Sequence, residues 1–119
     1  MDNKDKVAMA ERYVEAFEKG DISIIRGMYA DDATVEDPVG TEVHRGLEAI
    51  CAFYENSLGA GAKLTLTGPA RCAGNAMAFP FKVALPGMEI EVIDVFEFND
   101  QGKITSMKAY WGPDNLRQL

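Results

Sequence analysis

The stretch that decides the fold is Met88–Phe98, MEIEVIDVFEF, in which apolar and charged residues alternate. Alternation with a period of two is typical of a β-strand that buries one face. The even-numbered positions are apolar apart from Asp94, whereas the other face carries Glu89, Glu91 and Glu97, which mark it as the solvent side. The pattern therefore predicts a strand whose even-numbered residues face the core.

Asp94 is the one acidic residue that this pattern places on the buried face. Burial disfavours the ionised form, so the pKa of Asp94 should be raised and the carboxyl should remain a hydrogen-bond donor near neutrality. Carboxyl groups with a raised pKa are typical of catalytic sites. From the pattern alone, a slipped register, a β-bulge or a salt bridge to a hidden basic residue explains the same acid equally well.

The neighbouring segments extend the period-two pattern through the second half of the chain. They are KLTLTG (63 to 68), NAMAFPFKVAL (75 to 85) and KITSMKAYW (103 to 111). Glycine, proline and asparagine between them indicate turns at 68–69, 74–75, 86–87 and 99–102. We therefore expect a meander of about four strands.

The first half of the chain has helical spacing instead. Apolar residues recur three and four positions apart in three segments, namely Val7, Ala10, Val14 and Phe17; Ile22, Ile25, Met28 and Tyr29; and Leu47, Ile50, Cys51, Tyr54 and Leu58. Gly20 and Asp21 indicate the end of the first helix and the start of the second. Residues 33 to 36 favour a short strand that ends at Asp37. The fold class is therefore α+β, with three helices packed on a curved, mostly antiparallel sheet that encloses an apolar pocket.

Composition limits the function. A length of 119 residues predicts a single domain, residues 1–119. Twelve basic residues against 19 acidic ones give a net charge of −7, which argues against nucleic acid and anionic membranes as partners. No apolar run is long enough for a membrane span or a signal peptide, so we expect a cytoplasmic protein. Cys51 and Cys72 lie in no metal or redox motif and are expected to be reduced.

Few other residues suggest chemistry. Tyr13 and Tyr54 should point inward, where core packing is a sufficient explanation. Asp37 precedes a proline, as turn-initiating aspartates often do, and the acids around it do not match a calcium loop, so we expect no metal. The single histidine, His44, is expected at the surface. Nucleotide-binding and zinc motifs are missing, so no cofactor is expected.

Five segments, in order along the chain, resemble the ketosteroid isomerase family. They are RYVEAFEKGD (12 to 21), MYADDATVEDPVG (28 to 40), AFYENSL (52 to 58), VIDVFEF (92 to 98) and SMKAYW (106 to 111). The resemblance implies the cone-shaped fold of the nuclear transport factor 2-like superfamily and a homodimer. Ile93 and Val95 on the outer face of the sheet are compatible with such pairing.

The resemblance also implies roles for individual residues. Asp37 matches the general base of the family, and Tyr13 and Asp94 match its two oxyanion-hole donors. A carboxylic acid kept neutral by apolar surroundings is an established device of these enzymes. Tyr54 and Tyr29 match tyrosines that support Tyr13 through hydrogen bonds.

The implied activity is a steroid Δ-isomerase that converts Δ5-3-ketosteroids to Δ4-3-ketosteroids. The proton would move from C4 to C6 through a dienolate, without metal or cofactor. Trp111 resembles an aromatic neighbour of the base. The other candidate substrate-binding residues are Phe53, Phe79, Phe81, Val83, Phe96, Met107 and Ala109. The alternatives are a non-catalytic carrier of apolar ligands or another enzyme on this fold, such as a polyketide cyclase or an epoxide hydrolase.

Overall fold

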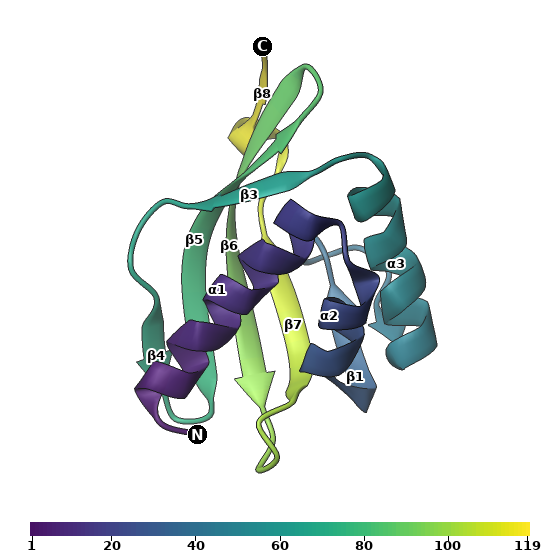
Figure 1. Cartoon of the computed structure of the whole chain (residues 1–119). Coiled ribbons are helices and arrows are strands. Elements are labelled where there is room, and N and C mark those ends of the chain that lie inside the picture. Colours follow the sequence, from purple (N-terminus) through teal and green to yellow (C-terminus); the bar gives the residue numbers. More distant parts are fainter.

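The computed structural model describes all 119 residues, and helices precede most of the strands, as the sequence patterns predict (Figure 1). The helices are α1 (Asn3–Lys19), α2 (Ile22–Met28), α3 (Leu47–Gly59) and the short 3-10 helix η1 (Pro113–Asn115). The strands are β1 (Tyr29–Glu36), β2 (His44–Arg45), β3 (Lys63–Leu66), β4 (Arg71–Ala73), β5 (Ala76–Leu85), β6 (Met88–Phe98), β7 (Ile104–Tyr110) and β8 (Leu116–Gln118).

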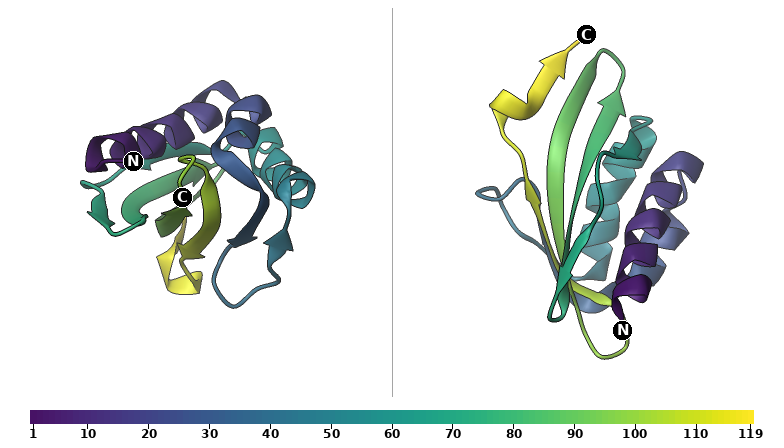
Figure 2. Two further views of the ribbon diagram at one scale, coloured as in Figure 1. Left: turned by 90° about the horizontal axis from the view of Figure 1, so that it is seen from below. Right: turned by 90° about the vertical axis from the view of Figure 1, so that its left-hand side faces the viewer.

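All eight strands form one curved sheet, in the order β2-β1-β7-β6-β5-β3, with β4 beside β5 and β8 beside β6. The pairing of β1 with β7 is parallel, and all other pairings are antiparallel. Figure 2 shows the three helices together on one side of this sheet. The predicted α+β class, with helices on a curved and mostly antiparallel sheet, is confirmed.

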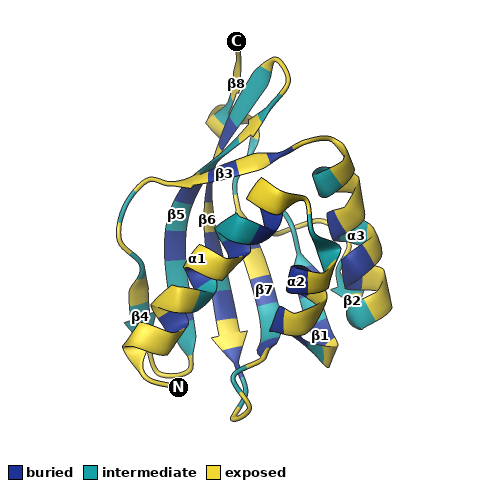
Figure 3. Cartoon of the chain, in the orientation of Figure 1, coloured by how far each residue is buried: buried dark blue, intermediate teal, exposed yellow.

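Strand β6 lies at the centre of the sheet, and the predicted alternation along it is confirmed. Its even-numbered residues from Ile90 to Phe98 are all buried, while Glu91, Ile93 and Glu97 are exposed (Figure 3). The register places Asp94 between Phe79 on β5 and Ala109 on β7. No register shift interrupts β6 at this position, so Asp94 lies on the inner face as the pattern predicts.

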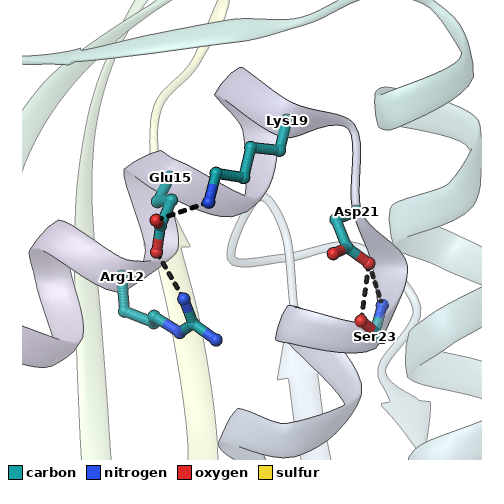
Figure 4. A network of polar contacts seen from close by, with 5 residues as sticks. All are labelled: Arg12, Glu15, Lys19, Asp21 and Ser23. Carbon is teal, nitrogen blue, oxygen red and sulfur yellow. Dashed lines mark hydrogen bonds and ion pairs between the residues drawn. The ribbon is translucent and has the colours of Figure 1, made fainter.

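The junction of α1 and α2 forms where the sequence predicts it. Gly20 adopts the left-handed conformation, with φ of 62°, which lets the chain leave α1 without strain. The Asp21 carboxylate then accepts a hydrogen bond of 2.9 Å from the Ser23 N–H and caps α2. Figure 4 shows this cap beside the solvent-exposed ion pairs of α1, in which Glu15 contacts Arg12 and Lys19. The two helices therefore meet at a tight, capped corner.

The predicted inner face of α1 is wrong by one residue at its start. Val7 is 39% exposed, whereas Lys6 is buried. The Lys6 ammonium donates a hydrogen bond of 2.6 Å to the carbonyl of Gly74, in the turn before β5, while its aliphatic stem is covered. A hydropathy pattern assigns lysine to the solvent, so it does not predict a lysine whose ammonium bonds to a buried acceptor.

None of the helices is both long and apolar enough to cross a membrane.

Two further differences concern strand boundaries. Tyr29 was expected in the second helix but is the first residue of β1, because β1 pairs with β7 from Tyr29 onward. The short strands β2, β4 and β8 were not predicted. Two or three residues carry too little periodicity to be recognised, and only their pairing with longer neighbours makes them strands.

Candidate active site

Asp94 is almost completely enclosed, with 1% of its surface exposed. Neither of its side-chain oxygens has a hydrogen-bond partner within the protein. Burial, and secondly the charge of Asp37, raise the pKa of Asp94 well above its usual value. The nearby Tyr13 opposes this shift, although no hydrogen bond joins the two side chains in this structure. This shift favours the neutral carboxylic acid form of Asp94, which has a proton to donate.

Tyr13 comes from α1 and is buried against a cluster of aromatic rings. Its ring packs edge-on against Phe17 and Phe96, each with 5.2 Å between ring centroids, and against Phe79 at 5.9 Å. Such packing fixes the ring, so that the hydroxyl is held in one place. Burial and the charge of Asp94 raise the pKa of Tyr13 well above its usual value, which keeps the phenol protonated.

Three buried phenols form a chain of hydrogen bonds. The Tyr54 hydroxyl on α3 lies 2.9 Å from that of Tyr13 and 2.5 Å from that of Tyr29. Burial is the largest cause that raises the pKa of Tyr54 and Tyr29 well above the usual value. Because each hydroxyl has one proton, the chain has one direction at a time, and Tyr54 can orient Tyr13. The chain joins α1, α3 and β1 at one point.

Asp37 directly follows β1 and is half-buried. The Trp111 indole donates a hydrogen bond of 2.8 Å from Nε1 to Oδ1 of Asp37. The loop after Asp37 is fixed to the sheet, because the Val39 N–H donates a hydrogen bond of 2.8 Å to the Ala109 carbonyl on β7. Burial raises the pKa of Asp37, while the Trp111 bond and then the charge of His44 act in the opposite direction. Asp37 is thus a carboxylate with increased basicity.

These groups lie at or beside one cavity of about 210 Å³ between the helices and the sheet. Of the predicted site residues, seven line it: Tyr13, Asp37, Phe53, Tyr54, Phe81, Val83 and Trp111. Seven lining residues were not predicted: Phe17, Ser57, Ala62, Leu64, Leu85, Ile90 and Val92. Ile90 and Val92 share the inner face of β6 with Asp94, so the same alternation could have indicated them.

The remaining predicted site residues do not line the cavity. Asp94, Tyr29, Phe79, Phe96, Met107 and Ala109 are all buried and lie behind its wall. Phe79 and Phe96 differ from the expected wall position because they pack around Tyr13 instead. Phe79 also lies opposite Asp94 on the neighbouring strand, so these two rings provide apolar surroundings for Tyr13 and Asp94.

His44 differs from the expected surface position. It is half-buried on β2, opposite Val35 of β1, and its ring packs against Phe53 with 4.6 Å between centroids and an angle of 34° between the ring planes. Phe53 lines the cavity, so His44 supports the wall from behind. No group of three or more histidine, cysteine or acidic side chains comes together in a way that could hold a metal ion.

The cavity and the residues directly behind its wall combine three chemical groups. A carboxylate with increased basicity, Asp37, reaches an apolar space, and two proton donors held in a dry environment, Tyr13 and Asp94, lie near it. A base and neutral donors in one apolar site are suited to removing a proton from carbon next to a carbonyl while stabilising the charge on its oxygen.

Comparison with known proteins gives three findings. The model of the SnoaL-like domain family matches residues 10–107. A protein of Nocardioides simplex named Steroid Delta-isomerase is 41% identical over 115 residues, which covers 93% of this chain and 92% of that protein. A solved structure of the epoxide hydrolase/cyclase-like enzyme SalBIII, described in pyran ring formation in the polyether salinomycin, superposes with a TM-score of 0.91 at 25% identity and full coverage of both chains.

Proposed function

Because the chain belongs to the SnoaL-like domain family, and within it to the relatives of the Nocardioides steroid Delta-isomerase, we propose that it is itself a steroid Δ-isomerase. The reaction moves the double bond of a Δ5-3-ketosteroid into conjugation with the 3-keto group. The observation that carries this proposal is the position of Asp37, a basic carboxylate fixed by Trp111 on the wall of an otherwise almost apolar cavity.

Asp37 is the general base of the proposed mechanism. The C4 proton of the substrate is acidified by both the carbonyl and the double bond, and the Asp37 carboxylate removes it. Oδ1 is occupied by the Trp111 N–H, so Oδ2 is the oxygen that accepts the proton. The protonated Asp37 then returns the proton to C6. Burial raises the pKa of Asp37, which makes the carboxylate a stronger base without requiring a metal.

Tyr13 and Asp94 form the proposed oxyanion hole. Loss of the C4 proton gives a dienolate, whose negative charge gathers on the C3 oxygen. The raised pKa values favour the protonated form of both residues, and packing fixes both before the substrate arrives, so they do not reorganise when that charge develops. Tyr54 and Tyr29 support Tyr13, because a hydroxyl that receives a hydrogen bond becomes a better donor.

The remaining predictions are part of the same proposal. The apolar wall formed by Phe53, Phe81, Val83 and Trp111 binds the fused rings, and no cofactor takes part.

We also propose a homodimer formed through the outer face of the sheet, where Ile93 and Tyr110 lie opposite each other and are 48% and 49% exposed. A cytoplasmic location remains a prediction from the sequence.

A second candidate function is supported by the likeness to the epoxide hydrolase/cyclase-like enzyme. Asp37 could activate a hydroxyl group while Asp94 protonates an epoxide oxygen, so the same two residues suit that chemistry. The identity to the steroid isomerase relative is higher, and for this reason the isomerase is the preferred function.

The experiment that tests the proposal is the conversion of a Δ5-3-ketosteroid to its conjugated Δ4 isomer by the purified chain, followed by ultraviolet absorbance. We expect conversion well above the buffer rate. A protein that binds the steroid but does not convert it would be a carrier, and opening of a steroid epoxide without isomerisation would favour the second candidate.

A further inference from the structure

Ser57 is the one uncharged polar side chain of the cavity wall that has no hydrogen-bond partner in the protein. The Tyr13 and Tyr54 hydroxyls are bonded to each other, and the Trp111 indole is bonded to Asp37. A serine within a helix commonly bonds to the carbonyl four residues earlier, but the Ser57 hydroxyl makes no such bond with Phe53. This hydroxyl is therefore free to bind a ligand.

The position of Ser57 on α3 directs its side chain into the cavity. It follows Phe53 by four residues and Tyr54 by three, so all three lie on one face of the helix. All three line the cavity. Ser57 is half-buried there, in the last turn of the helix, whereas the Tyr54 hydroxyl reaches back to Tyr13.

The last turn of α3 lies next to the start of β3. The Ser57 carbonyl accepts a hydrogen bond of 3.2 Å from the Ala62 N–H, which leads directly into β3 (Figure 1). Leu64 of β3 lies opposite Val83 of β5, which in turn lies opposite Ile90 of β6. These three residues form a row across the sheet, and all of them line the cavity.

This row is distant from the proposed oxyanion hole. Ile90 and Asp94 are four residues apart on β6, which corresponds to about 13 Å at the usual rise of about 3.3 Å per residue. A steroid whose C3 oxygen lies at Tyr13 and Asp94 would therefore direct its far end, ring D, toward the row of Leu64, Val83 and Ile90. Ser57 is the polar group on that side.

We propose that the Ser57 hydroxyl forms a hydrogen bond with an oxygen atom on or next to ring D, and that Ser57 is the residue that recognises oxygenation at this end of the steroid. The inference rests on the proposed isomerase function and adds a specificity-determining residue to it. A serine hydroxyl both donates and accepts, so a ketone and a hydroxyl group are equally suitable. A steroid without this oxygen removes water from the Ser57 hydroxyl but offers no hydrogen bond in its place, and this loss lowers affinity.

The test uses two Δ4-3-ketosteroids that differ only in a 17-keto group, because these product-type ligands bind without further turnover. Their dissociation constants are measured with the wild-type protein, with Ser57→Ala, and with Ser57→Thr, which retains a hydroxyl. Ser106→Ala is the matched control, because Ser106 is also half-buried without a side-chain hydrogen bond but lies opposite the exposed Glu97.

We expect Ser57→Ala to reduce the preference for the 17-keto steroid by about tenfold, the usual effect of one hydrogen bond. Affinity for the steroid without this group should stay unchanged. Ser57→Thr should retain most of the preference, and Ser106→Ala all of it. Using the change in the ratio of the two constants removes the difference in hydrophobicity between the ligands.

An unchanged ratio in Ser57→Ala would overturn the inference about Ser57 and leave the isomerase function intact. Binding of both ligands without conversion of the matching Δ5 substrates would overturn the isomerase function, while the ratio would still decide the role of Ser57. Failure of the wild-type protein to bind either steroid would overturn both.

Discussion

The Trp111 indole N–H holds Oδ1 of Asp37 through a hydrogen bond of 2.8 Å, although the two residues are 74 positions apart in the chain. This bond fixes the carboxylate plane and leaves Oδ2 as the free oxygen. It also stabilises the ionised form of Asp37, in opposition to the burial that raises the pKa of this residue. The base thus becomes stronger through burial, and Trp111 limits how strong it becomes.

Replacing Trp111 with phenylalanine should raise the pKa of Asp37. The variant loses the hydrogen bond that favours the carboxylate, and burial then acts with less opposition. Because the base must be ionised to act, the decline of kcat/KM at acid pH should move to higher pH. A pH profile of kcat/KM for both proteins measures this shift, and an unshifted or lowered acid limb would contradict the role of Trp111.

Replacing Asp94 with leucine should lower kcat by about 10²–10³-fold, the usual effect of losing one oxyanion donor. Asparagine at this position retains a neutral donor and should lower kcat less than leucine does. Steady-state kinetics of both variants with one substrate provide the comparison. Equal kcat values for the wild-type protein and Asp94→Leu would show that Asp94 is only a structural residue.

Asp94 should also make the stability of the protein depend on pH. The folded-state pKa of Asp94 is raised, so between about pH 4 and that raised pKa the unfolded chain releases a proton that the folded protein keeps. Stability is then lost as pH rises above about 4, by at most about 1.4 kcal/mol per pH unit for this group. Asp94→Asn lacks this contribution.

Urea unfolding at pH 5 and pH 7 measures the effect. The stability of Asp94→Asn relative to the wild-type protein should increase from pH 5 to pH 7. A stability difference that is the same at both pH values would indicate an ordinary pKa for Asp94.

Replacing Tyr54 with phenylalanine should lower the free energy of unfolding by about 2 kcal/mol, because two buried hydroxyls lose their shared partner. Activity should also fall, since Tyr13 is no longer oriented. Tyr110→Phe is the matched control, because it removes a hydroxyl that makes no hydrogen bond within the chain and keeps the apolar ring on the proposed dimer face, so the change should stay within about 0.5 kcal/mol. Equal effects of both substitutions would contradict a role for the tyrosine chain.

The inner face of the sheet could be predicted from the sequence because it depends on a local pattern. Alternation along Met88–Phe98 predicts that Asp94 faces inward, and Gly20 and Asp21 predict the corner between α1 and α2. In both cases the physical cause lies within a few residues. The pleat of the strand determines which side chains of β6 face inward, and backbone conformation and capping determine where α1 ends and α2 begins. The structure agrees with these predictions.

Depth within the cavity could not be predicted in this way. Phe79 and Phe81 share one face of β5, but only Phe81 lines the cavity, while Phe79 lies beside Asp94 and packs on Tyr13. Which of them is deeper depends on the register of β5 against β6 and on the position of α1. The Lys6 contact with Gly74 and the packing of His44 against Phe53 likewise depend on how distant segments come together.

The central claim is that Asp37 carries a proton from C4 to C6, and a C4-deuterated Δ5-3-ketosteroid tests it most directly. The wild-type protein should convert this substrate and place deuterium at C6 of the product, as measured by mass spectrometry and NMR. Asp37→Asn should bind the same steroid but convert it at least about a hundredfold more slowly, because proton transfer is lost and the shape is kept. Conversion by Asp37→Asn at the wild-type rate, with the same deuterium at C6, would show that another group carries the proton.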